Sequence, residues 1–425
     1  MSNAFPKDVV VAWQESIEKF DSDNIVAKNC KVERSGGEQQ FNSNFRTWKP
    51  VSMISRTVDG LDITASLGKS VTELAVPFDI DKIPNVPFTL DAKELNDPRM
   101  LRKKINSAVD QMSARLNRDV VNVIKNQSGQ TVTQSGALTT YNDIAAAESA
   151  LIRQDVSQTT LKTMALNIPD YNTVSGNLAA RETLGQKALG AYERSLVGDV
   201  ASFDTFRTSF MPQITAAAAG AVVTAGGAAQ SHIPVPSQVN PLTGNTENLD
   251  NRFMSLEVDT TASVVPGDRF TIAGVFETSL INKVNTNELR TFTVVGVIDA
   301  THVNISPAPV ALDGFTSGSP TDSESDYANV TVALPDATAL TWVNTTAAPM
   351  SAFWENDSIC ISVGNLAVEG LSGVNVMRDV TDSGIQLIIA NEGNVGTLAN
   401  QYRITAFYGI TNEDPMKNGI VLANQ

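Results

Sequence analysis

Residues 291–307 read Thr-Phe-Thr-Val-Val-Gly-Val-Ile-Asp-Ala-Thr-His-Val-Asn-Ile-Ser-Pro, and with two shorter runs they decide the fold of their part of the chain. The shorter runs are Leu-Asp-Asn-Arg-Phe (249–253) and Gly-Asp-Arg-Phe-Thr-Ile-Ala-Gly-Val (267–275). Phe, Val and Ile alternate with polar residues, and Pro-Gly-Asp and Asp-Ala-Thr-His interrupt them, which is typical of short antiparallel strands joined by turns. The pattern predicts a small β-barrel within a larger domain.

The surrounding segment, residues 222–347, has a composition of its own. It carries 13 Asp and Glu against 4 Lys and Arg, which makes −9 of the net charge of −15. At its start, residues 216–229 are only Ala, Gly, Val and Thr, a composition that favours a linker over a packed core. We therefore expect an acidic, surface-displayed module inserted into another domain.

The best helical pattern outside this module follows Asp97-Pro98. Asp supplies an N-cap and Pro suits the first helical position. Apolar residues then recur every three or four positions, at Leu101, Ile105, Val109, Met112, Leu116, Val120 and Ile124. About thirty residues at 1.5 Å each predict a helix of roughly 45 Å.

Four basic residues, Arg99, Arg102, Lys103 and Lys104, lie in the first two turns of this predicted helix. The helix macrodipole disfavours cations there. Two interpretations stay open. The cluster either meets an external anionic partner, such as a neighbouring subunit's carboxylates or DNA phosphate, or it is a solvated face.

The rest of the chain predicts an α+β protein. Residues 9–29 have helical spacing with an acidic opposite face, which indicates an amphipathic N-terminal arm. Residues 31–88 are polar with short strand-like runs, and residues 140–211 predict helices around a strand. Strand patterns at 358–363, 384–389 and 402–408 follow the module. We expect them, with 353–357, to return to the first domain, so that one core contains elements from both sides of the module.

Length and composition indicate an ordinary globular chain. With 425 residues, 42% of them hydrophobic, two or three domains are expected. No run of eighteen apolar residues and no signal-peptide pattern occurs, which predicts cytosolic synthesis and no membrane partner. Cys30 and Cys360 are predicted to be free, buried thiols. The net charge of −15 argues against a protein that grips nucleic acid, although an acidic wall can enclose it.

Motifs for catalysis or metal binding are scarce. The two histidines, His232 and His302, have no ligand partner at metal-binding spacing, and no phosphate-binding glycine loop occurs. Asp322, Glu324 and Asp326 have the spacing of the first ligands of a calcium loop, but the later Gly and Glu are missing, so we interpret them as a solvated loop. We predict neither an enzyme nor a cofactor or metal site.

Further runs stand in a collinear order along nearly the whole chain. They are Lys-Glu-Leu-Asn-Asp-Pro-Arg-Met-Leu-Arg-Lys-Lys-Ile-Asn-Ser-Ala (93–108), Asn-Ile-Pro-Asp-Tyr (167–171), Ala-Tyr-Glu-Arg (191–194), Val-Ala-Ser-Phe-Asp (200–204), Thr-His-Val-Asn-Ile-Ser-Pro-Ala-Pro-Val-Ala-Leu-Asp (301–313), Tyr-Ala-Asn-Val (327–330) and Ala-Phe-Tyr-Gly-Ile (406–410). Together with the runs quoted first, this set resembles the major coat protein family of short-tailed Salmonella phages, the P-22 type. The set as a whole carries the resemblance, because no single motif is diagnostic.

The resemblance implies an α+β fold of the Hong Kong 97 capsid type with an inserted all-β, telokin-like barrel. It divides the chain into an N-terminal arm (1–40), an extended loop (41–90), a peripheral domain with a long spine helix (91–150 plus 411–425), an axial domain in two parts (151–221 and 348–410) and the inserted β-barrel domain (222–347).

The resemblance also implies a function. The protein would be a virion component, a major capsid protein that self-assembles as pentamers and hexamers into an icosahedral head in the host bacterial cytoplasm. Its implied partners are a scaffolding protein, which directs precursor assembly, and a portal protein, through which double-stranded DNA enters as the head expands. The DNA is enclosed without sequence-specific binding, and a decoration protein is a further partner that the family allows.

Candidate contact residues follow from the resemblance and the charge pattern. Glu15 and Glu18 on the arm could receive a basic helix of the scaffolding protein through charge complementarity, or they could be a solvated face. The candidates for contacts between subunits are Arg99, Arg102, Lys103, Lys104, Glu247 and Asp250. Glu247 and Asp250 are included because the loop 240–244, acidic in the family, is uncharged in this chain.

Two alternatives of other kinds stay open. A shell protein of a cellular cargo compartment with the same fold would enclose an enzyme in place of DNA. An enzyme or carbohydrate-binding module with a β-barrel appendage would need a pocket with converging polar groups, and the 2 histidines and 6% aromatic content count against it.

Overall fold

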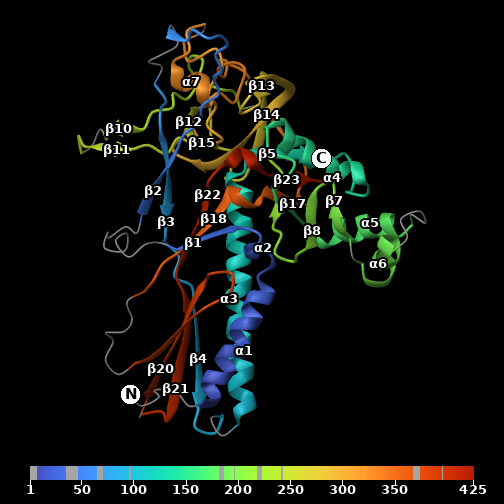
Figure 1. The fold of residues 1–425 in the computed structure, drawn as a ribbon, viewed down its shortest axis with the longest axis vertical. Helices are drawn as coiled ribbons and strands as arrows, with labels where there is room; N and C mark the ends of the chain where they lie inside the picture. The colour runs from blue at the N-terminus through green and yellow to red at the C-terminus, as the bar shows by residue number, and fades with distance from the viewer. Residues whose placement is uncertain are drawn as a thin grey trace. The chain divides into compact units, whose positions relative to one another are not determined.

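The computed structural model describes residues 7–34, 46–64, 70–94, 97–180, 186–195, 197–217, 223–240, 243–316, 318–366, 374–394 and 396–425. The chain forms two compact units, each built from segments that are separate in the sequence. Unit 1 comprises Met1–Thr47, Phe78–Val121 and Ile359–Thr411, and unit 2 comprises Trp48–Pro77, Asn122–Ser358 and Asn412–Gln425. Figure 1 draws both units and labels their helices and strands where there is room.

The helices of unit 1 are α1 (Lys7–Asp23), α2 (Ile25–Lys28) and most of α3 (Pro98–Gln127). The predicted N-cap of α3 is confirmed, because the Asp97 carboxylate accepts a hydrogen bond from the backbone N of Arg99 at 2.9 Å. The seven predicted apolar positions of α3 are all 6% exposed or less. Figure 1 shows α1 beside α3, and Asn117 of α3 accepts hydrogen bonds from the backbone N of Val26 and Ala27 at 3.2 Å each.

The sheets of unit 1 combine distant segments. A three-stranded sheet has the order β1 (Lys31–Arg34), β18 (Ile359–Val363), β22 (Tyr408–Asn412), and a four-stranded sheet has the order β19 (Asn375–Val380), β20 (Gln386–Asn394), β21 (Ala399–Ala406), β4 (Asn85–Asp91). The strands predicted after the module are thereby confirmed. Tyr402 of β21 lies opposite Phe88 of β4, with ring centroids 5.2 Å apart. Cys30 and Cys360 are buried thiols that form no disulfide bond with each other, as predicted.

Two strands, β2 (Arg46–Val51) and β3 (Leu74–Asp79), pair with each other. In each of them the chain passes from a segment of one unit to a segment of the other. Both fall in the region that the sequence predicted to be extended. None of the described helices is long and apolar enough to cross a membrane.

Unit 2 contains a seven-stranded sheet. Its order is β5 (Gln130–Thr133), β23 (Asn418–Leu422), β17 (Ala348–Glu355), β6 (Lys162–Leu166), β8 (Phe203–Arg207), β7 (Gly198–Val200), with β9 (Gln213–Ile214) paired to β17. The helices α4 (Tyr141–Arg153), α5 (Ile168–Ala179) and α6 (Gln186–Arg194) belong to the same unit. Because β17 pairs with β6 on one side and β23 on the other, the sheet joins strands from both sides of the inserted module, as predicted.

The inserted module of unit 2 is β-rich, as the opening sequence pattern predicts. A five-stranded antiparallel sheet has the order β12 (Met254–Glu257), β15 (His302–Ser306), β14 (Asn285–Val297), β13 (Arg269–Thr278), β16 (Leu340–Trp342). A hairpin of β10 (Ser237–Val239) and β11 (Thr246–Asn248) and the short helix α7 (Asp322–Tyr327) complete it. Its apolar core includes Leu256, Phe270, Phe292, Ile305 and Leu340.

The start of the module differs from the sequence expectation of a linker. Val223 and Ala225 are 0% and 1% exposed. The backbone of 223–226 bonds to Thr338 and Leu340 near β16 and to Glu257 and Asp259 near β12. This short segment therefore links the two edges of the five-stranded sheet. Small residues suit the position because Gly226 and Gly227 lie against the Glu257 side chain.

Candidate interaction surfaces

The first candidate charges lie along the exposed sides of α1 and α3. Glu15 and Glu18 are both exposed on α1. The carboxylate of Glu15 lies 3.5 Å from the guanidinium of Arg102 on α3, and their side chains are 55% and 48% exposed. The structure thus brings one predicted scaffold contact and one predicted subunit contact together in an ion pair. Such an exposed pair contributes less than about 1 kcal/mol, so either charge is available to another partner.

The basic cluster at the start of α3 divides into engaged and exposed members. The Lys104 ammonium lies 2.6 Å from Glu94 and donates to the Thr89 carbonyl at 2.9 Å. The hydrogen bond from Lys104 lowers the pKa of Glu94. Arg99 and Lys103 are exposed. Lys104 and Arg102 therefore form ion pairs with carboxylates of the same chain, whereas the side chains of Arg99 and Lys103 are exposed to solvent.

The two acidic candidates of the inserted module occupy different surroundings. Glu247 is exposed on β11 and accepts two hydrogen bonds at 3.1 Å from the amide of Asn240 across the hairpin. Asp250 follows β11, is partly buried, and lies 2.7 Å from the guanidinium of Arg252. Glu247 thus presents an accessible charge at a hairpin, whereas the charge of Asp250 is largely balanced within the chain.

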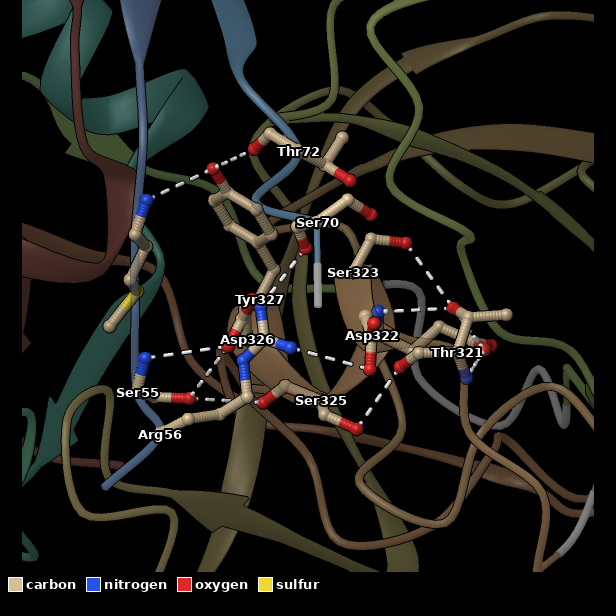
Figure 2. A network of polar contacts seen from close by, with 12 residues as sticks. Ser55, Arg56, Ser70, Thr72, Thr321, Asp322, Ser323, Ser325, Asp326 and Tyr327 are labelled. Atoms are coloured by element: carbon tan, nitrogen blue, oxygen red, sulfur yellow. Dashed lines mark hydrogen bonds and ion pairs between the residues drawn. The ribbon is translucent and has the colours of Figure 1, made fainter. Parts of the chain in front are cut away.

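The Asp/Glu run of α7 is part of a polar network, which Figure 2 shows. Glu324 caps its own helix: it accepts from the backbone N of Thr321 and Phe315 at 2.8 and 2.6 Å. Burial acts to raise the pKa of Glu324, but these hydrogen bonds outweigh it and lower the pKa. Asp326 is 1% exposed and lies 2.7 Å from Arg56. The expectation of a solvated loop is wrong for Glu324 and Asp326, because both carboxylates are buried and form hydrogen bonds or ion pairs within the chain.

A buried arginine joins the inserted module to the end of α3. Arg269 of β13 is 0% exposed. Its guanidinium donates to the carbonyls of Lys125, Ser128 and Gln130 and to the hydroxyls of Ser128 and Thr131, at 2.7 to 3.3 Å. Burial lowers the pKa of Arg269 below its usual range. The carbonyls at a helix C-terminus, which carry partial negative charge, offset that effect.

A second buried cluster connects α4 with β13 and β14. Glu277 is 2% exposed and lies 2.6 Å from Arg153 and 3.7 Å from Arg290. Burial lowers the pKa of Arg290, and Glu277 opposes that effect. The side-chain nitrogens of Arg290 have no hydrogen-bond partner within the described part of the chain. These charges hold α4, β13 and β14 together.

A cleft of about 720 Å³ lies over the four-stranded sheet of unit 1. Phe88, Ile388, Ala390 and Tyr402 contribute apolar surface, and Arg403 lies at its side, where its Nε donates to Asn85 at 2.8 Å. The surface is a broad, mostly apolar sheet face, which suits contact with another polypeptide better than a chemical reaction.

The histidines hold local structure. His232 Nε2 lies 2.9 Å from the amide oxygen of Asn251, and burial lowers the pKa of His232. His302 Nδ1 lies 2.9 Å from Asp299, whose pKa is lowered to about 2, first by the backbone N–H of Thr301 and then by His302. Within the described ranges no group of three or more His, Cys, Asp or Glu side chains could hold a metal ion.

Sequence reasoning did not single out Arg56, Tyr327, Arg269 or Arg290. Arg290 alone has a local signal, because it stands two residues before Phe292 in the alternation that places Phe292 and Val294 in the core. Arg56 and Tyr327 have no such signal, because their partners are about 270 residues away in the sequence.

Comparisons with solved structures give the following similarities. A structure from Mycobacterium phage Che8 and the capsid structure of cyanophage P-SCSP1u are each 8% identical to the chain. They match 92% and 93% of it and 88% and 86% of their own chains, with TM-scores of 0.43 and 0.45. The I-domain of the CUS-3 coat protein is 28% identical over 29% of this chain and 96% of its own length, with a TM-score of 0.21.

The sequence profile of the family described as "P22 coat protein - gene protein 5" matches residues 1–423. The fold class expected from the sequence, α+β of the Hong Kong 97 capsid type, is confirmed. Since the match spans nearly the whole chain, the chain belongs to the P22 coat protein family: it is a structural protein of the phage capsid that assembles with copies of itself, and not an enzyme.

Proposed function

We propose that this chain is the major head protein of a short-tailed phage of the Salmonella type, and that pentamers and hexamers of it form an icosahedral head around double-stranded DNA. The single observation that carries the proposal is the family match over residues 1–423. Assembly takes place in the host bacterial cytoplasm around a scaffolding protein. The head expands as DNA enters through a portal protein, and a decoration protein is a further candidate partner.

The proposed domain boundaries are those expected from the sequence. They define an N-terminal arm (1–40), an extended loop (41–90), a peripheral domain (91–150 plus 411–425), an axial domain (151–221 and 348–410) and a telokin-like insert (222–347). Residues 1–6, 35–45 and 65–69 lie outside the described residues, as do 181–185, 218–222 and 367–373. Linkage of both edges of the inserted sheet through 223–226 supports a barrel-like insert.

The charge distribution supports an enclosing role toward DNA. A net charge of −15 repels phosphate, which keeps enclosed DNA mobile rather than fixed to the shell. For the scaffolding protein we propose Glu15 and Glu18. The exposed ion pair of Glu15 with Arg102 would be exchanged for a basic partner at little cost.

For contacts between subunits we propose the charges that the chain leaves accessible, Arg99, Lys103 and Glu247, ahead of Arg102, Lys104 and Asp250. Arg99 and Lys103 are exposed on α3, and Glu247 is exposed at the β10–β11 hairpin. The other three already have partners at 3.5, 2.6 and 2.7 Å.

Negative-stain electron microscopy tests the proposal, on the chain expressed alone and together with its neighbouring genes. Closed shells or tubes of pentamers and hexamers are expected, and DNA is expected inside heads isolated with the full set. A monomer that never assembles, even with those neighbours, would contradict it. Shells that co-purify with an enzyme in place of DNA would favour the cargo compartment.

A further inference from the structure

We propose that α7 of the inserted module is a latch for the extended segment: Asp326 and Tyr327 hold together residues 51–56 and 70–72, and this latch directs the segment for assembly. The assembly role rests on the proposed function. The latch itself rests only on contacts within unit 2, which Figure 2 shows.

Asp326 supplies the charge of the latch. Its side chain is 1% exposed, and one carboxylate oxygen lies 2.7 Å from Nη2 of Arg56. The other oxygen lies 3.4 Å from both the backbone N and the hydroxyl of Ser55. A buried carboxylate that loses its counterion is strongly unfavourable. Since Arg56 belongs to the extended segment, its guanidinium balances the buried Asp326 carboxylate while that segment is docked.

Arg56 also joins the two sides of the segment. Its Nη2 donates to the carbonyl of Ser70 at 3.0 Å. Its Nη1 lies 3.3 Å from Asp322, a side chain that is 44% exposed. The ion pair of Arg56 with Asp326 is therefore buried, whereas its ion pair with Asp322 is partly exposed to solvent.

Tyr327 makes a second bridge without charge. Its hydroxyl donates to the carbonyl of Thr72 at 2.7 Å and accepts from the backbone N of Met53 at 3.1 Å. Residues 53 and 72 lie on opposite sides of the excursion between β2 and β3. One phenol thus fixes the separation of the two sides.

Hydrogen bonds hold both ends of α7, whereas few side chains of the docked segment contact it. A reciprocal capping box of Thr321 and Glu324 fixes the start of α7, and the Lys283 ammonium donates to the Ala328 carbonyl just after its end at 2.9 Å. On the segment, the contacts are backbone groups plus Ser55 and Arg56. Elements held by a few polar contacts can open as a unit.

Beyond these contacts the segment presents apolar side chains to solvent. Ile54, Val58 and Leu61 are 63%, 51% and 107% exposed. In a chain that assembles with copies of itself, such a run is suited to cover a second copy. The latch then determines the direction in which that run leaves the subunit.

The test compares Arg56→Gln and Asp326→Asn with Arg46→Gln. The control makes the same Arg-to-Gln change at an exposed ion pair of β2, where Arg46 contacts Asp79 at 2.7 Å. Amide hydrogen exchange is measured on unassembled subunits. We expect each latch variant to raise exchange of peptides covering 51–56 and 70–73 about tenfold, with β13 and β23 unchanged and with Arg46→Gln like wild type. The effect of the double variant should fall short of the sum of the two single variants, because both substitutions remove the ion pair between Arg56 and Asp326.

Arg56→Gln alters a side chain of the extended segment and none of the inserted module. It can therefore be interpreted even if Asp326→Asn disturbs the folding of the module. Unchanged exchange in Arg56→Gln would overturn the latch, whatever happens to assembly. The assembly role is measured by light scattering and electron microscopy at matched concentrations, where we expect about a threefold lower yield of closed shells from the latch variants. Raised exchange with an unchanged yield would overturn that role. If the wild-type chain also forms no shells, the proposed function is contradicted. The hydrogen-exchange result then decides by itself whether the latch exists.

Discussion

At the scale of single residues, close approach and burial decide which positions tolerate change. Gly409 of β22 has no room for a side chain: a Cβ there would collide with the carbonyl oxygen of Asp79 and lie 3.0 Å from Cα of Ile80. Gly190 in α6 has no neighbour within 4 Å of the same position. These two glycines form a matched pair for a substitution experiment.

We expect Gly409→Ala to destabilise unit 1 by about 2–4 kcal/mol, because backbone must shift to make room for the methyl group. Gly190→Ala should be neutral or stabilise by about 0.5–1 kcal/mol, since Ala favours helix. Urea unfolding followed by tryptophan fluorescence measures both. Equal effects of the two substitutions would show that there is room for a methyl group between Gly409 and the backbone of Asp79 and Ile80.

Lys283 provides a prediction about pH. Burial lowers its pKa to about 8, against the opposing effects of Asp326 and Asp155. In the unfolded chain its pKa is about 10.4. Between these values the unfolded chain binds the additional proton, so this residue makes stability rise with pH from about 8 to about 10.

The measurement is the difference in free energy of unfolding between wild type and Lys283→Met from pH 7 to pH 10. Below pH 8 the lysine is charged in both states and its burial is fully unfavourable. Across the window, wild type should gain on the order of 2 kcal/mol relative to the variant. A difference that stays constant with pH would contradict the lowered pKa.

At the scale of elements, α3 is fixed at both ends by side chains of different origin. Asp97, next to it in sequence, caps the start. Arg269, more than 140 residues away, binds the carbonyls at the other end. The inserted module is therefore part of what terminates the longest helix.

We expect Arg269→Met to destabilise unit 2 by about 3–5 kcal/mol, because buried carbonyls at the end of α3 lose their donors. Arg269→Lys should recover only part of this, since an ammonium lacks the planar set of five donors. Arg118→Met is the control: that side chain is exposed on the same helix, so its effect should stay within about 0.5 kcal/mol. Thermal unfolding followed by circular dichroism compares the three variants, and equal effects of Arg269→Met and Arg118→Met would contradict the capping role.

At the scale of the whole molecule, the core of the inserted module is self-contained. Its apolar cluster consists of residues between Val223 and Trp342. The sheet edges are linked by 223–226, within the same stretch. The module therefore has a complete core without the seven-stranded sheet.

We expect residues 223–347 expressed alone to unfold cooperatively on heating and to give dispersed amide resonances by NMR. Arg269 and Glu277 would then face solvent rather than α3 and α4, so the fragment should be less stable than the module within the chain. A fragment without cooperative unfolding would show that those anchors, and not the apolar cluster, determine its fold.

Sequence patterns predicted elements well where the signal is local. The N-cap and apolar spacing of α3, the alternation in β13 and β14, and the return of strands to one sheet after the insertion were all confirmed. The linker expected over 216–229 was wrong for 223–226, because small residues there serve close strand contacts. Composition alone cannot distinguish a flexible small-residue run from a closely packed one.

The α+β class, the capsid family, the inserted β-rich module and the start of the long helix could all be inferred from the amino-acid sequence, because they depend on short-range periodicity and on collinear runs. The pairing of the charged side chains became visible only in the folded chain. Asp326 pairs with Arg56, Arg269 caps α3, and Glu15 meets Arg102. Those pairings join residues from 87 to 270 positions apart, and an ionisable side chain carries no local pattern that names its distant partner; only the folded chain brings opposite charges together and removes water from around them.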